Sequence, residues 1–264
     1  MNFTRLNGSL THWAARGKAD GPAIIFANSL GTDLRIWDEV VALLGARYRT
    51  ITYDKRGHGL SELTAGPYDI DTLAGDVLAL ADAQGCKRFA MVGLSVGGLI
   101  AQAVAIRAPE RLTALVLCDT VSRHGTPEMW AARIGAIETA GLDSIADGIL
   151  KLWFTQKFRT ERLDELGGWR NMLVRTPAAG YIATCGALRD TDLAAAVQSI
   201  KTPTLAVAGD EDGSTPPALV KASAARIPGA RFEVIPGAGH LPCIEQPVAL
   251  ARLIDAHIME ASRD

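Results

Sequence analysis

Short apolar runs alternate along the chain with longer segments whose apolar residues recur at helical spacing. Each short run is bounded by turn or charged residues, as is typical of strands buried on both faces. The runs that predict central strands are Ala23–Asn28, Arg49–Asp54, Phe89–Leu94, Ala114–Asp119, Thr204–Gly209 and Arg231–Pro236. A looser alternation from about Phe3 to Arg16 predicts an antiparallel hairpin at the edge of the sheet.

The segments between these runs predict helices. From Ile70 to Leu80, apolar residues recur at the spacing of a helix that ends before Gly85. Further helices are expected over Val96–Arg107, Pro217–Ile227 and Pro247–Ile258. Repeated strand–helix units imply the α/β fold class, with an open and mostly parallel sheet that helices cover on both faces.

This alternation stops between about Val121 and Asp190, where the pattern is purely helical and rich in tryptophan and arginine. Turn-like sequences bound the segment on both sides. We therefore expect a helical cap over residues 122–189, inserted into a core formed by residues 1–121 and 190–264.

Composition narrows the class of protein. The length of 264 residues suits one large domain, or one domain carrying an insertion, and the 48% of hydrophobic residues is enough for a substantial core. A formal net charge of −2, without a basic run, predicts neither a nucleic acid nor a membrane surface as a partner. The sequence makes no prediction of the oligomeric state.

The four cysteines are scattered, without a C-x-x-C pair or a metal-binding spacing, so we expect free, buried thiols in a reducing compartment. The N-terminal MNFTRLNGSL lacks the basic and apolar blocks of a signal peptide. No uncharged apolar run approaches membrane-spanning length. A cytoplasmic location is the expectation.

The segment MVGLSVGGLI places Ser95 among glycines, after a predicted strand and before a predicted helix. In that context G-x-S-x-G predicts a sharp turn that strains the serine backbone and exposes the hydroxyl. The hydroxyl would then lie above the carboxyl ends of the strands, where open α/β sheets bind ligands. Ser95 is therefore the candidate nucleophile, and a structural serine in a glycine-rich turn is the alternative.

A serine nucleophile needs a base, which is usually histidine. Of the five histidines, only His240 is both late in the chain and on a loop that leaves the carboxyl end of a strand. His240 is thus the predicted base. His257, in the C-terminal helix, is expected at the surface.

A carboxylate should orient the imidazole and stabilise its protonated form. The loop after Thr204–Gly209 carries Asp210, Glu211 and Asp212, in a known chain order of serine, acid and histidine. Asp212 is the predicted acid and Asp210 the alternative, whereas Glu211 is expected in solvent.

A serine that attacks a carbonyl group generates an oxyanion, which main-chain N–H groups can stabilise. The N–H of Val96, at the start of a helix, and that of Leu30, on the loop after the first central strand, are the predicted pair. Gly31 would allow that loop to turn tightly. Asn28 and Ser29 are expected to brace it through side-chain hydrogen bonds.

Together with the order of Ser95, Asp212 and His240, nearly the whole chain resembles the 3-oxoadipate enol-lactonases of the α/β-hydrolase superfamily. The segments that carry the resemblance are DKRGHG with Ser61, ANSLGTDLRIWD (Ala27–Asp38), GTPEMWAARI (Gly125–Ile134), LWFTQKFR (Leu152–Arg159), GYIATCGALRDTDL (Gly180–Leu193) and STPP (Ser214–Pro217). Two segments depart from the family pattern, Arg123-His124 and Leu241-Pro242-Cys243.

The resemblance implies an α/β-hydrolase fold with an eight-stranded sheet and a helical cap after the sixth strand. It further implies that Ser95, His240 and Asp212 open a small-molecule substrate, 3-oxoadipate enol-lactone, through an acyl-enzyme in the β-ketoadipate pathway of aromatic compound catabolism. No metal or other cofactor is implied. Candidates to bind the substrate carboxylate are Arg133 and Trp130, with Trp153 as an apolar wall or indole donor.

Other functions fit the same residues. A carboxylesterase, a perhydrolase or a carbon–carbon bond hydrolase needs only a different cap pocket on the same triad. A haloalkane dehalogenase is disfavoured because its nucleophile is a carboxylate. An alternative of another class is a non-catalytic ligand receptor on a hydrolase fold, which turnover would distinguish from an enzyme.

Overall fold

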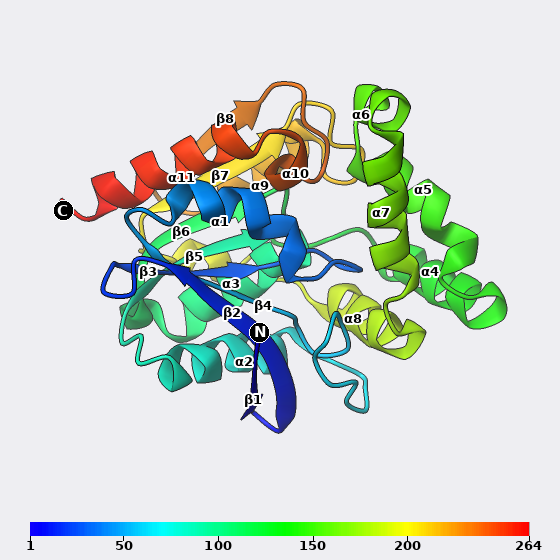
Figure 1. Ribbon diagram of the computed structural model, residues 1–264, viewed down its shortest axis with the longest axis horizontal. Coiled ribbons are helices and arrows are strands. Elements are labelled where there is room, and N and C mark those ends of the chain that lie inside the picture. The colour runs from blue at the N-terminus through cyan, green and yellow to red at the C-terminus, as the bar shows by residue number, and fades with distance from the viewer. Residues whose placement is uncertain (264) are drawn as a thin grey trace.

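The computed structural model describes residues 1–263, and its strands form one eight-stranded sheet in the order β1-β2-β4-β3-β5-β6-β7-β8 (Figure 1). The strands are β1 (Asn2–Leu6), β2 (Ser9–Gly17), β3 (Ala23–Ala27), β4 (Arg49–Tyr53), β5 (Phe89–Leu94), β6 (Leu112–Cys118), β7 (Thr204–Gly209) and β8 (Arg231–Ile235). The β1–β2 and β2–β4 pairs are antiparallel and all others are parallel. The predicted edge hairpin and central strands are confirmed.

Helices cover both faces of the sheet, as predicted. In Figure 1, α1 (Asp38–Leu44) and α11 (Pro247–Ala261) pack against each other on one face. On the other face α2 (Ile70–Ala83) packs against α3 (Val96–Arg107). The remaining elements of the core are α9 (Pro217–Ala224), α10 (Pro242–Glu245) and the short 3-10 helices Leu34–Trp37, Pro109–Arg111 and Ala196–Ser199.

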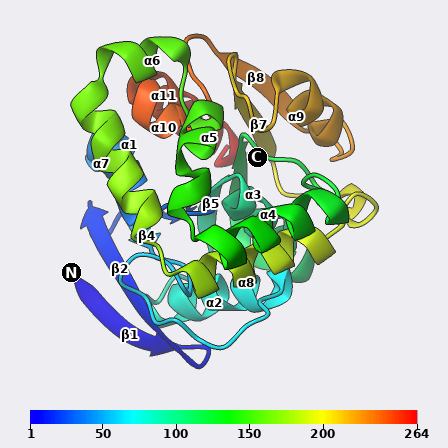
Figure 2. The same ribbon diagram turned by 90° about the vertical axis from the view of Figure 1, so that its right-hand side faces the viewer.

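A purely helical segment follows β6, the sixth strand. Its helices are α4 (Pro127–Ala140), α5 (Asp143–Trp153), α6 (Gln156–Glu161), α7 (Leu163–Val174) and α8 (Ala178–Asp190). Thr126 caps α4 by accepting a hydrogen bond from the N–H of Met129, and proline occupies the first turn. Figure 2 shows these helices standing in front of one end of the sheet. The carboxyl ends of the parallel strands lie at this end of the sheet.

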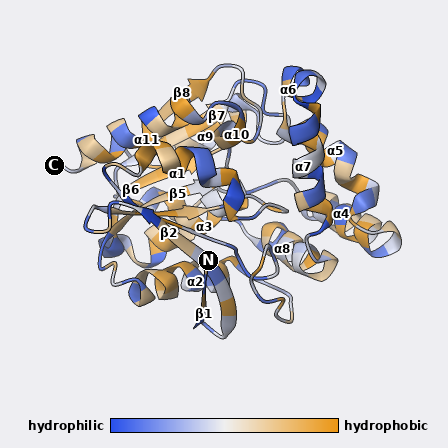
Figure 3. Cartoon of the chain, viewed as in Figure 1, coloured by the Kyte–Doolittle hydropathy of each residue, from blue (hydrophilic) through white to orange (hydrophobic). Residues whose placement is uncertain are grey.

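The core lies between the sheet and its helices. Central strand residues such as Ile25, Val92 and Val116 are fully buried, and Figure 3 shows hydrophobic colour along these strands. All four cysteines are free and buried, as expected. Within residues 1–263, no helix has the length and apolar character needed to cross a membrane.

One expectation about the helices is wrong. His257 was expected at the surface, but it is only 4% exposed. It lies on the face of α11 that packs against β6, beside Ile254 and Ile258. Its imidazole is within hydrogen-bonding distance of the Pro203 carbonyl, with Nε2 3.1 Å from the oxygen. The other ring nitrogen, Nδ1, lies 3.1 Å from the Arg231 guanidinium, so both nitrogens have partners, which explains how a polar residue occupies a core-facing position.

Candidate active site

Ser95 occupies the turn between β5 and α3. Its backbone has φ 58° and ψ −120°, a strained conformation for a residue with a side chain. A Cβ on Gly93 would lie 2.2 Å from the Gly97 carbonyl oxygen, and one on Gly97 would lie 2.1 Å from that of Ala27. The sharp turn that the sequence predicts is therefore present, and glycine is required on both sides of it. The Ser95 side chain does not cap α3 and lines a cavity instead.

His240 and Asp212 are brought together from the loops after β8 and β7. His240 Nδ1 lies 2.9 Å from Asp212 Oδ2, and both residues are buried. Asp212 also accepts hydrogen bonds from the Ser214 and Thr215 main-chain N–H groups and from the Thr215 hydroxyl. Burial alone would raise the pKa of Asp212, but the charge of His240 and these hydrogen bonds hold it below its usual range. Asp212 is thus a carboxylate at neutral pH.

The other two acids of this loop lie apart from His240. Asp210 and Glu211 are exposed. The Asp210 carboxylate accepts a hydrogen bond from the Ala238 N–H at 3.2 Å, so it supports the loop that precedes His240. The structure therefore places Asp212, and not the alternative Asp210, against the imidazole.

The loop after β3 brings Leu30 to the same end of the sheet. Gly31 has φ 73°, and a Cβ there would lie 2.6 Å from Leu173 Cδ1. The Gly31 N–H donates to His58 Nε2 at 3.1 Å. Asn28 Nδ2 donates to the Thr32 carbonyl at 2.7 Å, as expected, whereas Ser29 supports the loop through its carbonyl, which accepts from the Thr32 hydroxyl.

The Leu30 and Val96 N–H groups, the predicted oxyanion donors, are both free to bind a ligand atom. Neither makes a hydrogen bond to another group in the described part of the chain. Val96 is the first residue of α3, where the helix leaves its N–H groups without partners.

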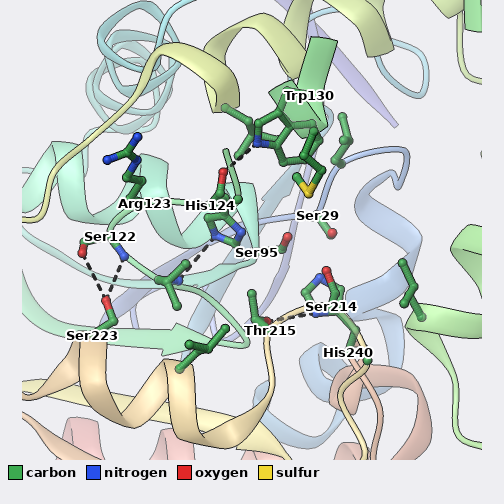
Figure 4. A pocket seen from close by; sticks show the side chains of 18 of the residues that line it. Ser29, Ser95, Ser122, Arg123, His124, Trp130, Ser214, Thr215, Ser223 and His240 are labelled. Atoms are coloured by element: carbon green, nitrogen blue, oxygen red, sulfur yellow. Dashed lines mark hydrogen bonds between the residues drawn. The ribbon is translucent and has the colours of Figure 1, made fainter. Parts of the chain in front are cut away.

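A cavity of about 510 Å³ lies between Ser95, His240 and Leu30 on one side and the helical segment on the other. Figure 4 shows Ser95, His240, Ser29 and Trp130 around it. All three predicted substrate-binding residues, Trp130, Arg133 and Trp153, line the cavity. The Arg133 guanidinium lies over the Trp130 ring, 5.0 Å from its centroid. The Trp130 indole N–H donates to the His124 carbonyl at 2.6 Å, so Trp130 presents its ring to the cavity rather than a free donor.

The end of α5 is attached to the loop that carries His240. The His240 N–H donates to the Trp153 carbonyl at 2.8 Å. Glu245 accepts hydrogen bonds from the Thr155 hydroxyl at 2.7 Å and from the Gly239 N–H at 2.8 Å. The same contacts therefore hold both Trp153, which lines the cavity, and His240, the predicted base.

Sequence reasoning gave no role to His124, which also lines the cavity (Figure 4). His124 Nε2 lies 3.1 Å from the Thr120 hydroxyl, which in turn donates to the Ser95 carbonyl at 2.7 Å. Burial, followed by the charge of His240, lowers the pKa of His124 to about 3. The ring is therefore neutral at pH 7. The sequence indicated only that His124 lies at the start of the predicted helical segment.

Asp119 was also missed, although it ends a predicted strand at the carboxyl edge of the sheet. It is fully buried, and its Oδ1 accepts from the Gly209 N–H at 2.8 Å. Ligand atoms of Asp119, Asp212 and His240 lie within 4.8 Å of one another.

The protonation state of Asp119 leads to a prediction about stability. Asp119 Oδ2 has no hydrogen-bond partner among residues 1–263. Burial, followed by the charge of Asp212, raises the pKa of Asp119 well above its usual range. The folded state thus keeps a proton that the unfolded chain loses above about pH 4, so Asp119 lowers stability as the pH rises above that value.

We expect Asp119→Asn to stabilise the protein at pH 8 by about 1 to 3 kcal/mol, because asparagine is neutral at every pH and folding then requires no uptake of a proton. At pH 3.5 the gain should vanish, since the aspartate is then protonated in both states. Urea unfolding at the two pH values measures the difference. An equal effect at both would show that Asp119 is charged in the folded protein.

The strand order and the strained serine turn after β5 are those of the α/β-hydrolase class. A family model described as "Alpha/beta hydrolase family" matches residues 24–253. The chain belongs to this family and is a hydrolase.

Within the family, the chain is similar to 3-oxoadipate enol-lactonases. It is 36% identical to 3-oxoadipate enol-lactonase 2 of Acinetobacter baylyi, over 93% of this chain and 91% of that protein. The crystal structure of the enol-lactonase from Burkholderia xenovorans LB400 aligns with a TM-score of 0.95 at 36% identity, covering 98% of this chain and 100% of that one. The resemblance seen in the sequence is confirmed.

More distant relatives have other names. A thermophilic esterase from Thermogutta terrifontis aligns with a TM-score of 0.93 at 26% identity, covering 99% of each chain. The fold is thus common to proteins that carry different names.

Proposed function

We propose that this chain hydrolyses 3-oxoadipate enol-lactone to 3-oxoadipate, with Ser95 as nucleophile, His240 as general base and Asp212 as the acid that orients it. The observation that carries the proposal is that Ser95, His240 and Leu30 line one cavity, where Asp212 contacts the His240 imidazole and the free Val96 N–H directly follows Ser95. The similarity to named enol-lactonases supports the choice of substrate.

The reaction would follow from this geometry. His240 removes the Ser95 proton as the hydroxyl oxygen attacks the lactone carbonyl, and the Leu30 and Val96 N–H groups hold the oxyanion. Asp212 stabilises the imidazolium. The ring oxygen leaves as an enolate, a better leaving group than a simple alkoxide, and takes the proton from the His240 imidazolium to become the enol. Water activated by His240 then releases the acyl group, and the enol tautomerises to the 3-oxo acid.

The substrate carboxylate would bind the cap side of the cavity. Arg133 is half-buried at the cavity wall, where its guanidinium stacks on Trp130. A stacked guanidinium is held in one orientation, which favours a two-point contact with a carboxylate. Trp153 forms an adjoining wall. We assign residues 122–189 as the cap that selects the substrate.

The test is a steady-state assay with freshly prepared 3-oxoadipate enol-lactone beside a neutral nitrophenyl ester. The proposal requires kcat/KM to be much higher for the lactone than for the ester. Turnover of the ester without turnover of the lactone would favour an esterase, the function named for the Thermogutta terrifontis relative. Binding without repeated turnover of either compound would favour the receptor alternative.

We expect Arg133→Ala to raise KM for the lactone by about ten- to a hundredfold, corresponding to the loss of a charge-assisted hydrogen-bonded contact. The KM for the neutral ester should change little, because that substrate has no carboxylate. Steady-state kinetics of both substrates measure the difference. An equal change for the two would remove Arg133 from this role.

A further inference from the structure

We propose that Lys55 is a positioning residue for the oxyanion hole: its buried ammonium polarises the Ser29–Leu30 peptide and strengthens the Leu30 N–H as a donor. Lys55 lies in the loop after β4, and its ammonium contacts the loop that carries Leu30. This inference rests on the proposed function, since it concerns the donor that would hold the oxyanion.

The contact that carries the inference is between a side chain and one peptide group. Lys55 Nζ donates to the Ser29 carbonyl oxygen at 2.5 Å and to that of Thr32 at 3.3 Å. The Ser29 carbonyl and the Leu30 N–H belong to the same planar, conjugated peptide unit. A cation at the oxygen therefore draws electron density away from the nitrogen and makes its proton a better donor.

Lys55 is not needed to satisfy these carbonyls. The Ser29 oxygen already accepts from the Thr32 hydroxyl at 2.9 Å, and the Thr32 oxygen already accepts from Asn28 Nδ2 at 2.7 Å. A neutral side chain of similar length would leave both oxygens with partners. Hydrogen-bond satisfaction therefore does not account for a charge at this position.

The charge is also costly where it lies. Lys55 is 1% exposed, and its hydrogen bonds within residues 1–263 go to main-chain carbonyls rather than to a carboxylate. Burying an ammonium without a direct counter-ion is unfavourable. The arrangement therefore requires a compensating advantage, and the low-dielectric surroundings that make the charge costly also strengthen its effect on the adjacent peptide.

Three titratable groups surround the ammonium. Asp54, which follows β4, and Asp33 on the Leu30 loop favour the charged form, and the His58 imidazole is held neutral by burial and by the Lys55 charge. Burial outweighs the two aspartates and lowers the pKa of Lys55 to about 7. The charged form is therefore lost as the pH rises through about 7, and the proposed assistance should be lost with it.

The test compares Lys55→Met with the wild type, using the enol-lactone and a boronic acid that forms a tetrahedral adduct with the active-site serine. We expect kcat to fall about tenfold, less than the loss of a whole oxyanion donor, with KM changed by less than about twofold. Boronate affinity should fall in proportion to kcat. The wild type should also lose kcat as the pH rises through about 7, whereas Lys55→Met should lack this decline.

Val77→Ala, in the buried core of α2, is the matched control for a loss of stability. It should lower the melting temperature without changing kcat or boronate affinity. If Lys55→Met does not fold, Lys55→Gln, which keeps a neutral donor, takes its place. Wild-type kcat and boronate affinity in the neutral variant would overturn the inference while leaving the proposed function intact. Retained activity in Ser95→Ala would instead contradict the proposed function.

Discussion

Ser95→Ala is expected to lower kcat for the enol-lactone by about a millionfold, the loss seen when a triad serine is removed. The reason is that the hydroxyl is the atom proposed to form the acyl-enzyme, and no neighbouring group can replace it. Ser95 lies in a strained turn, and its side chain caps no helix. The methyl group of alanine should therefore be accepted without loss of the fold.

Purified Ser95→Ala protein should give the circular dichroism and melting temperature of the wild type, with no turnover above background. Ser122→Ala is the matched control, because Ser122 lines the same cavity but has no proposed part in the reaction. Its kcat should remain within about twofold of the wild type. Substantial activity in Ser95→Ala would assign the nucleophile to another residue.

Asp212→Asn should lower kcat by about ten thousandfold, because an amide cannot stabilise the imidazolium and favours the wrong tautomer of His240. Asp210→Asn should leave kcat within about twofold of the wild type. The two aspartates are two residues apart on one loop, but only Asp212 contacts the imidazole, whereas Asp210 accepts from the Ala238 N–H. The asparagine oxygen can keep that second contact.

Steady-state kinetics at several pH values would complete this comparison. The pKa of Asp212 lies below its usual range, so its charge should be constant wherever the enzyme is active. Similar losses in the two variants would contradict the assignment of Asp212.

The fold was predictable because its signals are local. Apolar runs such as Phe89–Leu94 are too short and too apolar to be surface helices, and their bounding residues are turn formers. The turn around Ser95 was predictable for the same reason, since two glycines and a serine at fixed spacing specify one backbone geometry.

Contacts between distant segments explain what the sequence did not reveal. Nothing near His257 indicates that the Pro203 carbonyl will satisfy its ring. The charge of Asp212, ninety-three positions later, helps to raise the pKa of Asp119. The proposed role of Lys55 likewise depends on its contact with the Ser29 carbonyl. The role of Trp130 also depends on tertiary structure, because its indole N–H is taken by the His124 carbonyl.

The hydrogen bond from the His240 N–H to the Trp153 carbonyl has a consequence for protein engineering. Exchanging residues 122–189 for the corresponding segment of a relative would introduce a new pocket, but it would also replace Trp153, whose carbonyl holds the loop of His240, the proposed base. A chimera that keeps Trp153, Thr155 and their contacts with the His240 loop should tolerate extensive redesign of α4 and α8. One that replaces α5 is expected to lose catalytic rate before it gains a new specificity, so α4 and α8 are where altered substrate range is most readily evolved.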